Sequence, residues 1–307
     1  MTLKIGLIGL GAMGGGMAQS LRRKGFDLSV FDVRKEVADA FAKDGGAACA
    51  SLAELGAQCD VVVSVVVNAA QTESVLFGND GDNGTGTGTD GVAATMKPGS
   101  VFVMCSTVDP NVSIAFESRL AAMGLLYIDA PISGGAARAA SGEMTMMTAA
   151  TPEAYAKAGD VLDAMAGKVY RLGDKAGAGS KVKVINQLLA GVHIAAAAEA
   201  MALGLREGVD AAALYEVITH SAGNSWMFEN RMAHVLAADY TPLSAVDIFV
   251  KDLGIVLDMA RATKFPLPLS STAHQMFMQA STAGFAKEDD SAVIKIFPGI
   301  ELPTKKT

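Results

Sequence analysis

The sequence predicts an α/β fold: a doubly wound, mostly parallel sheet that a long interdomain helix joins to an all-helical C-terminal domain. In the first half of the chain, short apolar runs of strand length alternate with helical segments, which is typical of a parallel sheet covered by helices. Residues 177–206 then form a glycine-rich entry and one long, nearly all-apolar helix. The remainder shows no strand-like alternation, only helical segments.

The N-terminal run at residues 3–10 has the composition of a parallel strand buried on both faces. It leads into a G-x-G-x-x-G spacing, after which residues 13–24 continue as a helix. The first glycine permits a tight turn, the second lets a pyrophosphate approach the backbone, and the third allows close packing of helix on strand. The bare pattern is weak, but its place between strand and helix predicts a Rossmann-type dinucleotide site at Gly9, Gly11, Ala12, Met13 and Gly14.

An acidic residue, Asp32, ends the second predicted strand. It follows the glycines at about the distance, roughly 20 residues, at which such sites place an acid that binds the ribose. Because this carboxylate accepts hydrogen bonds from the ribose hydroxyls and repels a 2′-phosphate, the predicted cofactor is NAD rather than NADP. Arg34 weakens that preference, since an arginine here can also meet a phosphate. The alternative interpretation is an ordinary glycine-rich turn followed by a surface acid.

The rest of the first domain continues the alternation of strands and helices. Ser51 and Glu54 form a capping box that opens a short helix. Ligands of doubly wound sheets bind at the carboxyl ends of strands, where Val66, Val67 and Thr107 are expected to lie. Strands are expected at 61–67, 101–105, 125–131 and 144–149, and helices at 70–77 and 110–123.

The domain boundary is expected at a Gly-Ala-Gly hinge that begins at Gly177. It separates an NAD-binding domain, residues 1–176, from a helical C-terminal domain, residues 177–307, which starts with the interdomain helix at about 180–206. Residues 78–91 are polar and of low complexity, which predicts a surface loop that is either an inert insertion or a lid.

Five further segments of the C-terminal domain are expected to be helical. Ser244 and Asp247 are suitably placed to cap the helix expected at 244–263. The segments are 210–221, 224–238, 244–263, 270–284 and 290–296.

The interdomain helix is apolar on every side, which predicts that it is buried between other elements. Lys183, Asn186 and Gln187 interrupt the pattern and share one face of the helix. A lysine at this place either extends to solvent from the helix end or is desolvated. In the second case its pKa is lowered, and it can exchange a proton with a substrate hydroxyl near neutral pH.

The composition excludes several classes of protein. A net charge of −7 without a long basic cluster argues against nucleic acid and anionic membranes as partners. The uncharged run at 184–198 is shorter than the ~20 apolar residues of a membrane span. Cys49, Cys59 and Cys105 lack paired spacing, and no cluster of His, Asp or Glu has metal-ligand spacing. We expect a cytoplasmic protein that binds a small molecule and no metal.

Four ordered motifs resemble the β-hydroxyacid dehydrogenase family. They are the N-terminal GLGAMG, DAPISGG at 129–135, GAGSKVKVINQ at 177–187 and FVKDLGIVLD at 249–258. The resemblance runs from Lys4 to about Phe297. It implies a nicotinamide-dependent dehydrogenase with a Rossmann domain, a long interdomain helix and a helical C-terminal domain, assembled as a homodimer or homotetramer.

The resemblance also implies roles for single residues. Lys183 matches the catalytic lysine of the family. Ser133, Gly134 and Gly135 match the segment that holds the substrate carboxylate, and a hydroxyl followed by two glycine N–H groups suits an anion, although such a turn also occurs without a ligand. Asn186 and Gln187 match the amides beside the lysine; many members have Asn at the second position, so which amide contacts the substrate stays open.

Further matches concern the cofactor and the substrate branch. Lys251 matches a lysine that reaches the cofactor, with an ion pair to Asp247 as the alternative, while Val66, Val67 and Thr107 match positions near the nicotinamide. Residues 221–231 and 240–254 resemble a branch that oxidises four-carbon sugar acids at C2.

Polar and planar groups suit a polyhydroxy acid of this kind. Trp226 is therefore a candidate for substrate contact, and Arg138 either contacts the substrate or points into solvent. The alternatives to this branch are an NADP-dependent semialdehyde reductase, a 3-hydroxyisobutyrate-type dehydrogenase, and a protein that binds the cofactor only as a regulatory ligand.

Overall fold

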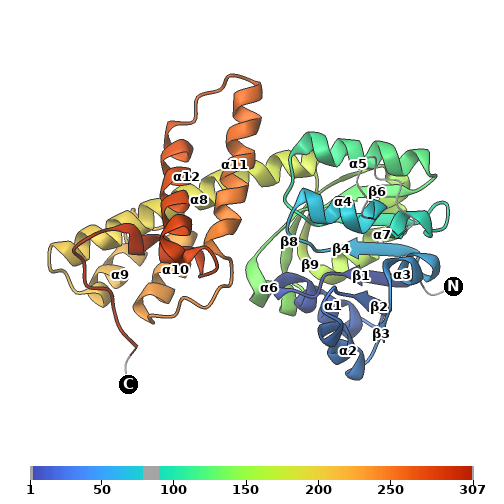
Figure 1. The fold of residues 1–307 in the computed structure, drawn as a ribbon, viewed down its shortest axis with the longest axis horizontal. Coiled ribbons are helices and arrows are strands. Elements are labelled where there is room, and N and C mark those ends of the chain that lie inside the picture. The colour runs from blue at the N-terminus through green and yellow to red at the C-terminus, as the bar shows by residue number, and fades with distance from the viewer. Residues whose placement is uncertain (1–2, 79–89, 306–307) are drawn as a thin grey trace. The chain divides into compact units, whose positions relative to one another are not determined.

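The computed structural model describes residues 3–78 and 90–305, and most of the loop expected at 78–91 lies outside these residues. The chain divides into two compact units, Met1–Lys183 and Val184–Thr307 (Figure 1). This division by compactness falls inside one helix. The boundary expected at residues 176 and 177 stays a prediction.

The described strands of the first unit form one nine-stranded sheet with the order β3-β2-β1-β4-β5-β6-β8-β7, and β9 pairs with β8. The strands from β1 to β6 are parallel to one another, whereas β8 is antiparallel to β6 and β7. Their bounds are β1 Lys4–Ile8, β2 Asp27–Phe31, β3 Ala47–Ala48, β4 Val61–Ser64, β5 Val101–Met104, β6 Leu126–Asp129, β7 Ile132–Ser133, β8 Met144–Ala150 and β9 Ala166–Arg171.

This order confirms the predicted doubly wound sheet. From β1 the chain winds outward to β2 and β3, then returns to β4 on the other side of β1. The carboxyl ends of β1 and β4 are therefore the topological switch point, where ligands of such sheets bind.

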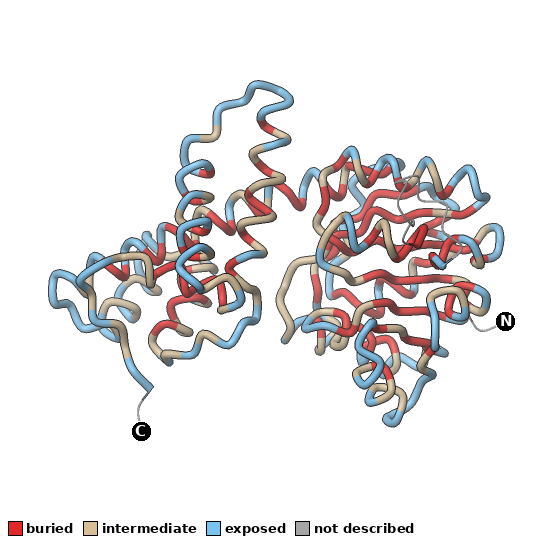
Figure 2. Tube along the Cα trace, in the orientation of Figure 1, coloured by how far each residue is buried: buried red, intermediate tan, exposed pale blue. Residues whose placement is uncertain are grey.

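Helices cover both faces of the sheet because alternate residues of each strand point to opposite faces. Val61 and Val63 of β4 join the core beneath α1 and α7, whereas Val62 joins the core beneath α3, α4 and α5. Strands β1, β2, β4, β5, β6 and β8 are accordingly buried along most of their length (Figure 2), whereas β3, β7 and β9 are mostly half-buried or exposed. The helices of this unit are α1 Ala12–Arg23, α2 Lys35–Lys43, α3 Leu52–Gln58, α4 Ala69–Phe77, α5 Pro110–Ala122, α6 Gly135–Ser141 and α7 Pro152–Met165, with a 3₁₀ turn at Val92–Ala94.

The second unit is built from helices, as predicted. Its core includes Val184 and Ile194 of α8 with Phe249 and Phe277, whose rings stack at a centroid distance of 5.1 Å. The helices are α8 Ala178–Arg206, which begins in the first unit, α9 Ala211–Thr219, α10 Trp226–Leu236, α11 Val246–Ala262 and α12 Pro268–Ala280, followed by a π turn at Ser281–Phe285 and a 3₁₀ helix at Asp290–Ile296.

The expected burial of α8 on every side is wrong for the single chain. Val184 and Ile194 are buried, but Ile185, Leu189 and Leu203 are 53%, 51% and 62% exposed. These exposed residues recur at helical spacing and so form one apolar face. By length and composition α8 is also the one described helix that could cross a membrane, a property it shares with core helices of soluble proteins.

Two local predictions also need correction. The strand expected at 61–67 ends at Ser64, because the chain leaves the sheet at the switch point while its sequence is still apolar. Ala245 is the residue before α11, with no side-chain cap. Asp247 instead accepts a hydrogen bond of 2.6 Å from the Ser281 hydroxyl, so its oxygen is engaged by the π turn.

Candidate functional site

The turn after β1 has the geometry that its glycines predict. Gly9 has a φ of +91°, and a Cβ there would lie 2.7 Å from the carbonyl oxygen of Val65. A Cβ on Gly14 would lie 1.8 Å from the carbonyl oxygen of Gly9, so only glycine lets α1 approach the turn so closely. Gly11 faces open space, since no atom of the described residues lies within 4 Å of the place that a Cβ on it would take. The turn therefore leaves room for a group at its second glycine.

The N-terminus of α1 fits the pyrophosphate of a dinucleotide. Gly11 precedes the helix and provides no side-chain cap, and the first turn carries no acidic residue. The backbone N–H groups of such a turn, together with the positive end of the helix dipole, favour a negatively charged ligand. Ala12 and Met13 begin this helix.

Asp32 follows β2 beside this turn and is 8% exposed. One carboxylate oxygen accepts the N–H of Leu10 at 2.7 Å, and the other accepts the N–H and Nε of Arg34 at 2.9 and 3.1 Å. Burial alone would raise the pKa of Asp32, but hydrogen bonds from Arg34 and Leu10 outweigh it and hold the pKa below its usual value. Asp32 is thus an ionised acceptor fixed at the end of β2.

The residues expected beside the nicotinamide lie where β4 and β5 end. The carbonyl oxygen of Val66 accepts a hydrogen bond of 2.8 Å from Ser106, and the N–H of Val67 donates to Gln71 at 2.8 Å. The Val67 side chain is 48% exposed, and Thr107 is half-buried. All three positions are therefore at the switch-point edge of the sheet.

The segment expected to hold a carboxylate joins β7 to α6. Gly134 and Gly135 have φ values of +141° and +79°, a region that residues with a Cβ rarely adopt. No atom of the described residues lies within 4 Å of a Cβ position on Gly135, whereas the stem of Arg138 lies against Gly134. Ser133 is half-buried and pairs with Thr145 of β8. The two glycines therefore give an open turn, which a residue with a Cβ would strain, next to a serine hydroxyl.

Lys183 lies in the second turn of α8 and is only 7% exposed. Lys183 also has an interaction partner. The structure therefore favours the desolvated lysine over one that extends to solvent.

The start of α8 is held by a buried acid that the sequence interpretation did not select. Asp129, at the end of β6, is 0% exposed and accepts the N–H groups of Gly177 and Ser180 at 2.8 and 2.9 Å. It also accepts the Ser180 hydroxyl at 2.6 Å. The only sequence signal was its place in the DAPISGG motif.

In the second unit, Asp252 links three of the predicted site residues. It is 2% exposed and accepts Gln187 Nε2 at 2.6 Å and Lys251 Nζ at 2.5 Å. Gln187 Oε1 in turn accepts Asn186 Nδ2 at 3.1 Å. Lys251 thus forms an ion pair with its neighbour Asp252, whereas Asp247 bonds to Ser281. The sequence interpretation missed Asp252, although it is adjacent to Lys251.

Trp226 is the first residue of α10 and is 54% exposed. Nearby, the Oδ1 atom of Asn224 is buried and has no hydrogen-bond partner among the described residues. Arg138, on α6, is exposed.

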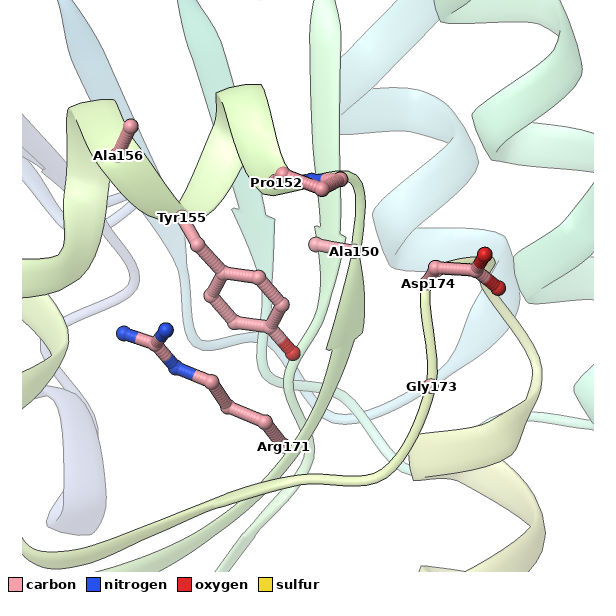
Figure 3. A pocket seen from close by; sticks show the side chains of 7 residues that line it. All are labelled: Ala150, Pro152, Tyr155, Ala156, Arg171, Gly173 and Asp174. Atoms are coloured by element: carbon pink, nitrogen blue, oxygen red, sulfur yellow. The ribbon is translucent and has the colours of Figure 1, made fainter.

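A separate hollow of about 370 Å³ lies around the ends of β8 and β9 (Figure 3). Two of its lining side chains already have partners: Tyr155 shares a hydrogen bond of 2.9 Å with Thr148, and Arg171 lies over the Tyr155 ring at 4.5 Å. None of the predicted site residues lines it. Among the described residues, no three His, Cys, Asp or Glu side chains gather as metal ligands would.

Two domain families match the chain. Residues 4–173 match the family described as the NAD binding domain of 6-phosphogluconate dehydrogenase. Residues 177–297 match the one described as NAD-binding of NADP-dependent 3-hydroxyisobutyrate dehydrogenase.

Individual proteins resemble the chain over its full length. L-threonate dehydrogenase of Cupriavidus necator is 68% identical over 305 residues, which is 99% of each chain. L-threonate dehydrogenase of Escherichia coli K12 is 51% identical over 99% of this chain and 97% of its own. A crystal structure described as 3-hydroxyisobutyrate dehydrogenase from Salmonella typhimurium is 52% identical, with a TM-score of 0.89, and covers 96% of this chain and 100% of its own.

Proposed function

The chain belongs to the β-hydroxyacid dehydrogenase family, and we propose that it catalyses the NAD-dependent oxidation of L-threonate at C2 to 2-dehydro-L-erythronate. The observation that carries this proposal is the 68% identity, over 99% of both chains, with a protein named L-threonate dehydrogenase. Family membership itself makes the protein a hydroxy acid dehydrogenase with a nicotinamide cofactor and a small-molecule substrate.

In the proposed reaction, the substrate carboxylate binds at Ser133, Gly134 and Gly135. The buried Lys183 accepts the proton of the C2 hydroxyl, so that C2 and its oxygen become a carbonyl group. The cofactor supplies the acceptor for the hydride that leaves C2. Asn186 or Gln187 directs the hydroxyl, and this orientation matters because alignment of the reacting atoms supplies much of the rate.

The cofactor is proposed to lie along the Gly9–Gly14 turn. Asp32 supports the choice of NAD, because a buried, ionised carboxylate repels a 2′-phosphate. Arg34 pairs with that carboxylate and so screens part of its charge. Val66, Val67, Thr107 and Lys251 are proposed to contact the nicotinamide half, and Trp226 the substrate.

We also propose a homodimer or homotetramer in the cytoplasm. The support for assembly is the apolar face of α8 at Ile185, Leu189 and Leu203, which is exposed in the single chain. An apolar face of this kind is typical of a protein–protein interface.

Two related reactions are the alternatives. The Salmonella structure named for 3-hydroxyisobutyrate makes that compound the second candidate substrate. The third candidate is an NADP-dependent reductase of 2-hydroxy-3-oxopropionate (tartronate semialdehyde). The description of the family matched by residues 177–297 includes NADP and so supports the cofactor of this candidate, but not its substrate. A protein that binds the cofactor only for regulation would carry Lys183 without using it.

The proposal is tested by initial rates of NAD and NADP reduction with L-threonate, D-threonate, D-erythronate, D-glycerate and 3-hydroxyisobutyrate. We expect the highest kcat/KM for L-threonate with NAD. If the enzyme turns over only 3-hydroxyisobutyrate or glycerate, its family membership stands, but L-threonate is not its substrate. NADPH-dependent reduction of tartronate semialdehyde above all other activities would favour the third candidate, and cofactor binding without any turnover would favour the regulatory one.

A further inference from the structure

The residue before helix α8, Gly177, has no side chain that could cap the helix. Gly177 accepts the first i to i+4 hydrogen bond of the helix, from the N–H of Lys181 at 2.9 Å, and thus occupies the capping position. It has no side chain to satisfy the free N–H groups of the first turn. Its φ of +95° and the 2.9 Å from a Cβ position to Ile114 oppose the Ser, Thr, Asp or Asn that usually cap a helix.

Asp129 performs the capping from another element, 48 residues earlier in the chain. One of its carboxylate oxygens accepts the N–H groups of Gly177 and Ser180, and the other accepts the Ser180 hydroxyl. Burial raises the pKa of Asp129, and the hydrogen bonds from Ser180 and Gly177 oppose that rise. All three bonds are donated to the carboxylate, so they favour its ionised form at the positive end of the helix.

The same turn of α8 is pressed against the sheet. A Cβ on Gly179 would lie 2.4 Å from the carbonyl oxygen of Met147 and 3.0 Å from that of Asp129. Met147 belongs to β8, two residues beyond Thr145, which pairs with Ser133. The start of the helix is therefore fixed to the strands that carry the proposed carboxylate segment.

These contacts have a consequence for Lys183, which lies one turn beyond Ser180. Asp129 ends β6, and the same chain continues within a few residues to Ser133. One buried side chain thus joins the segment proposed to hold the substrate carboxylate to the helix proposed to carry the proton acceptor. All of these residues lie within the first unit.

We propose that Asp129 is a positioning residue for the reaction: its carboxylate caps α8 and thereby sets the place of Lys183 relative to Ser133–Gly135. This inference rests on the proposed role of Lys183. Asp129 touches neither substrate nor cofactor in this account and acts through the helix alone.

The test compares Asp129→Ala, Asp129→Asn and Ser180→Ala in the full-length enzyme. Asparagine keeps the shape and can still accept both N–H groups while donating to the Ser180 oxygen, but it removes the charge. We expect Asp129→Ala to lower kcat about 100-fold, the order of loss that a misplaced catalytic group causes. Asp129→Asn keeps these hydrogen bonds in neutral form, and charge-assisted bonds are roughly twice as strong as neutral ones. Because the cap is weakened but not removed, we expect this variant to retain at least about a tenth of kcat. Ser180→Ala, which keeps the carboxylate and both N–H bonds, should lose only a few-fold.

Three further readouts separate positioning from general damage to the fold. The KM for the hydroxy acid and the Kd for NADH should stay within about threefold of wild type, and the isotope effect with C2-deuterated substrate should rise because hydride transfer becomes limiting. The matched control is Asp210→Ala, which removes the aspartate that caps α9 through the N–H of Ala213 at 2.9 Å. It should leave kcat unchanged.

Near-wild-type kcat in a folded Asp129→Ala enzyme overturns the inference, as does a loss of NADH binding equal to the loss of kcat. If that variant does not fold, wild-type kcat and isotope effect in both Asp129→Asn and Ser180→Ala overturn it. The Lys183→Ala variant distinguishes a failure of the proposed function from a failure of the role given to Asp129. Full turnover in Lys183→Ala refutes the proposed function itself. If Lys183→Ala loses turnover while Asp129→Ala stays active, only the role of Asp129 is refuted.

Discussion

Asp32 shows how one side chain determines the choice of cofactor. Its charge is maintained by hydrogen bonds from Leu10 and Arg34, even though burial opposes it. A fixed negative charge at this place discriminates against a 2′-phosphate, while ribose hydroxyls can still donate to it.

We therefore expect Asp32→Asn to lower the ratio of kcat/KM for NAD to that for NADP by about tenfold or more, which corresponds to about 1.4 kcal/mol. The ratio is obtained from initial rates with both cofactors. Asp39→Asn is the matched control, since this exposed acid of α2 pairs with Lys35 on its own helix at 2.6 Å. An unchanged ratio in Asp32→Asn would remove Asp32 from the account of specificity.

Asp252 connects the amides of α8 to Lys251. The Asp252→Asn substitution replaces the carboxylate with a neutral amide that has a single oxygen acceptor. Gln187 and Lys251, which bond to different carboxylate oxygens in the wild type, would then have to share that oxygen. We expect Asp252→Asn to lower kcat/KM by about tenfold, with part of the effect in the KM for NAD, because a charged hydrogen bond contributes about 1.5–3 kcal/mol.

Steady-state kinetics in both substrates measure this effect. Asp258→Asn serves as the comparison, because Asp258 lies on the same helix but forms an exposed ion pair with Arg261. Equal kinetics of the two variants would mean that the Asp252 network has no role in turnover.

The predicted and the missed residues differ in where their partners lie. Asp32 and the glycines could be predicted because a short, local spacing of residues indicates their role. Asp129 and Asp252 could not, since their partners are 48, 51 and 65 residues away and only the fold brings them together. Both acids lie inside motifs, DAPISGG and FVKDLGIVLD, but the motifs do not indicate which distant groups they bind.

A largely buried cluster of charges joins helix α10 to the 3₁₀ helix Asp290–Ile296. His234 of α10 contacts Asp289 at 3.0 Å, and Arg231 on the same helix pairs with Asp290. These acids lie at the start of the 3₁₀ helix Asp290–Ile296, so the cluster fixes that segment to α10.

The cluster makes stability depend on pH. The hydrogen bond with Asp289 raises the pKa of His234 above 6.5, while burial and the charge of Arg231 oppose the rise. A raised histidine pKa contributes stability that is present below pH 6.5 and is lost as pH rises through the folded value. Asp289, whose pKa is lowered to about 2, loses its contribution only in strong acid.

We therefore expect the urea midpoint of the wild type to be higher at pH 6 than at pH 9, and His234→Gln to reduce that difference. The substitution should also cost about 1–3 kcal/mol at pH 6, because it weakens the bond to a fully buried carboxylate. His220→Gln, at an exposed histidine, is the control. A pH difference unchanged in His234→Gln would show that other groups cause it.

Element boundaries could be predicted where the sequence changes between polar and apolar residues. They could not be predicted where the sequence stays uniformly apolar. Polar residues flank α4, and its predicted and observed bounds nearly coincide. The valines from 61 to 67 are uniform, and only the switch-point geometry ends β4 at Ser64. The cap expected at α11 is not formed, because the helix begins at Val246 with Ala245 at the capping position, and Asp247 bonds to the distant Ser281.

Helix α8 contributes to both units of the molecule, and its composition misled the prediction of burial. An apolar residue on a helix is buried either by its own chain or by another one, and the sequence does not distinguish the two. The exposed face at Ile185, Leu189 and Leu203 is the part that the single chain leaves uncovered.

We expect Leu189→Lys and Leu203→Lys to shift the protein from an oligomer to the 31.5 kDa chain, because a lysine at an apolar interface loses its hydration without gaining a partner. Light scattering coupled to gel filtration gives the mass. Leu172→Lys, in the first unit, should leave the assembly intact. A monomeric wild type, or an oligomer that survives both α8 substitutions, would contradict assembly through this face.

Lys183 is proposed to exchange the proton of the substrate hydroxyl, the step on which turnover depends. The most direct test of this role is the rate of NAD reduction with L-threonate by Lys183→Ala, measured together with NADH binding. Lys181→Ala is the matched control, because this lysine is two residues earlier on the same helix and exposed. We predict a loss of kcat of at least about 100-fold in Lys183→Ala, the range of general acid–base catalysis, with NADH binding nearly unchanged and Lys181→Ala fully active. Equal turnover of the two variants would contradict this role.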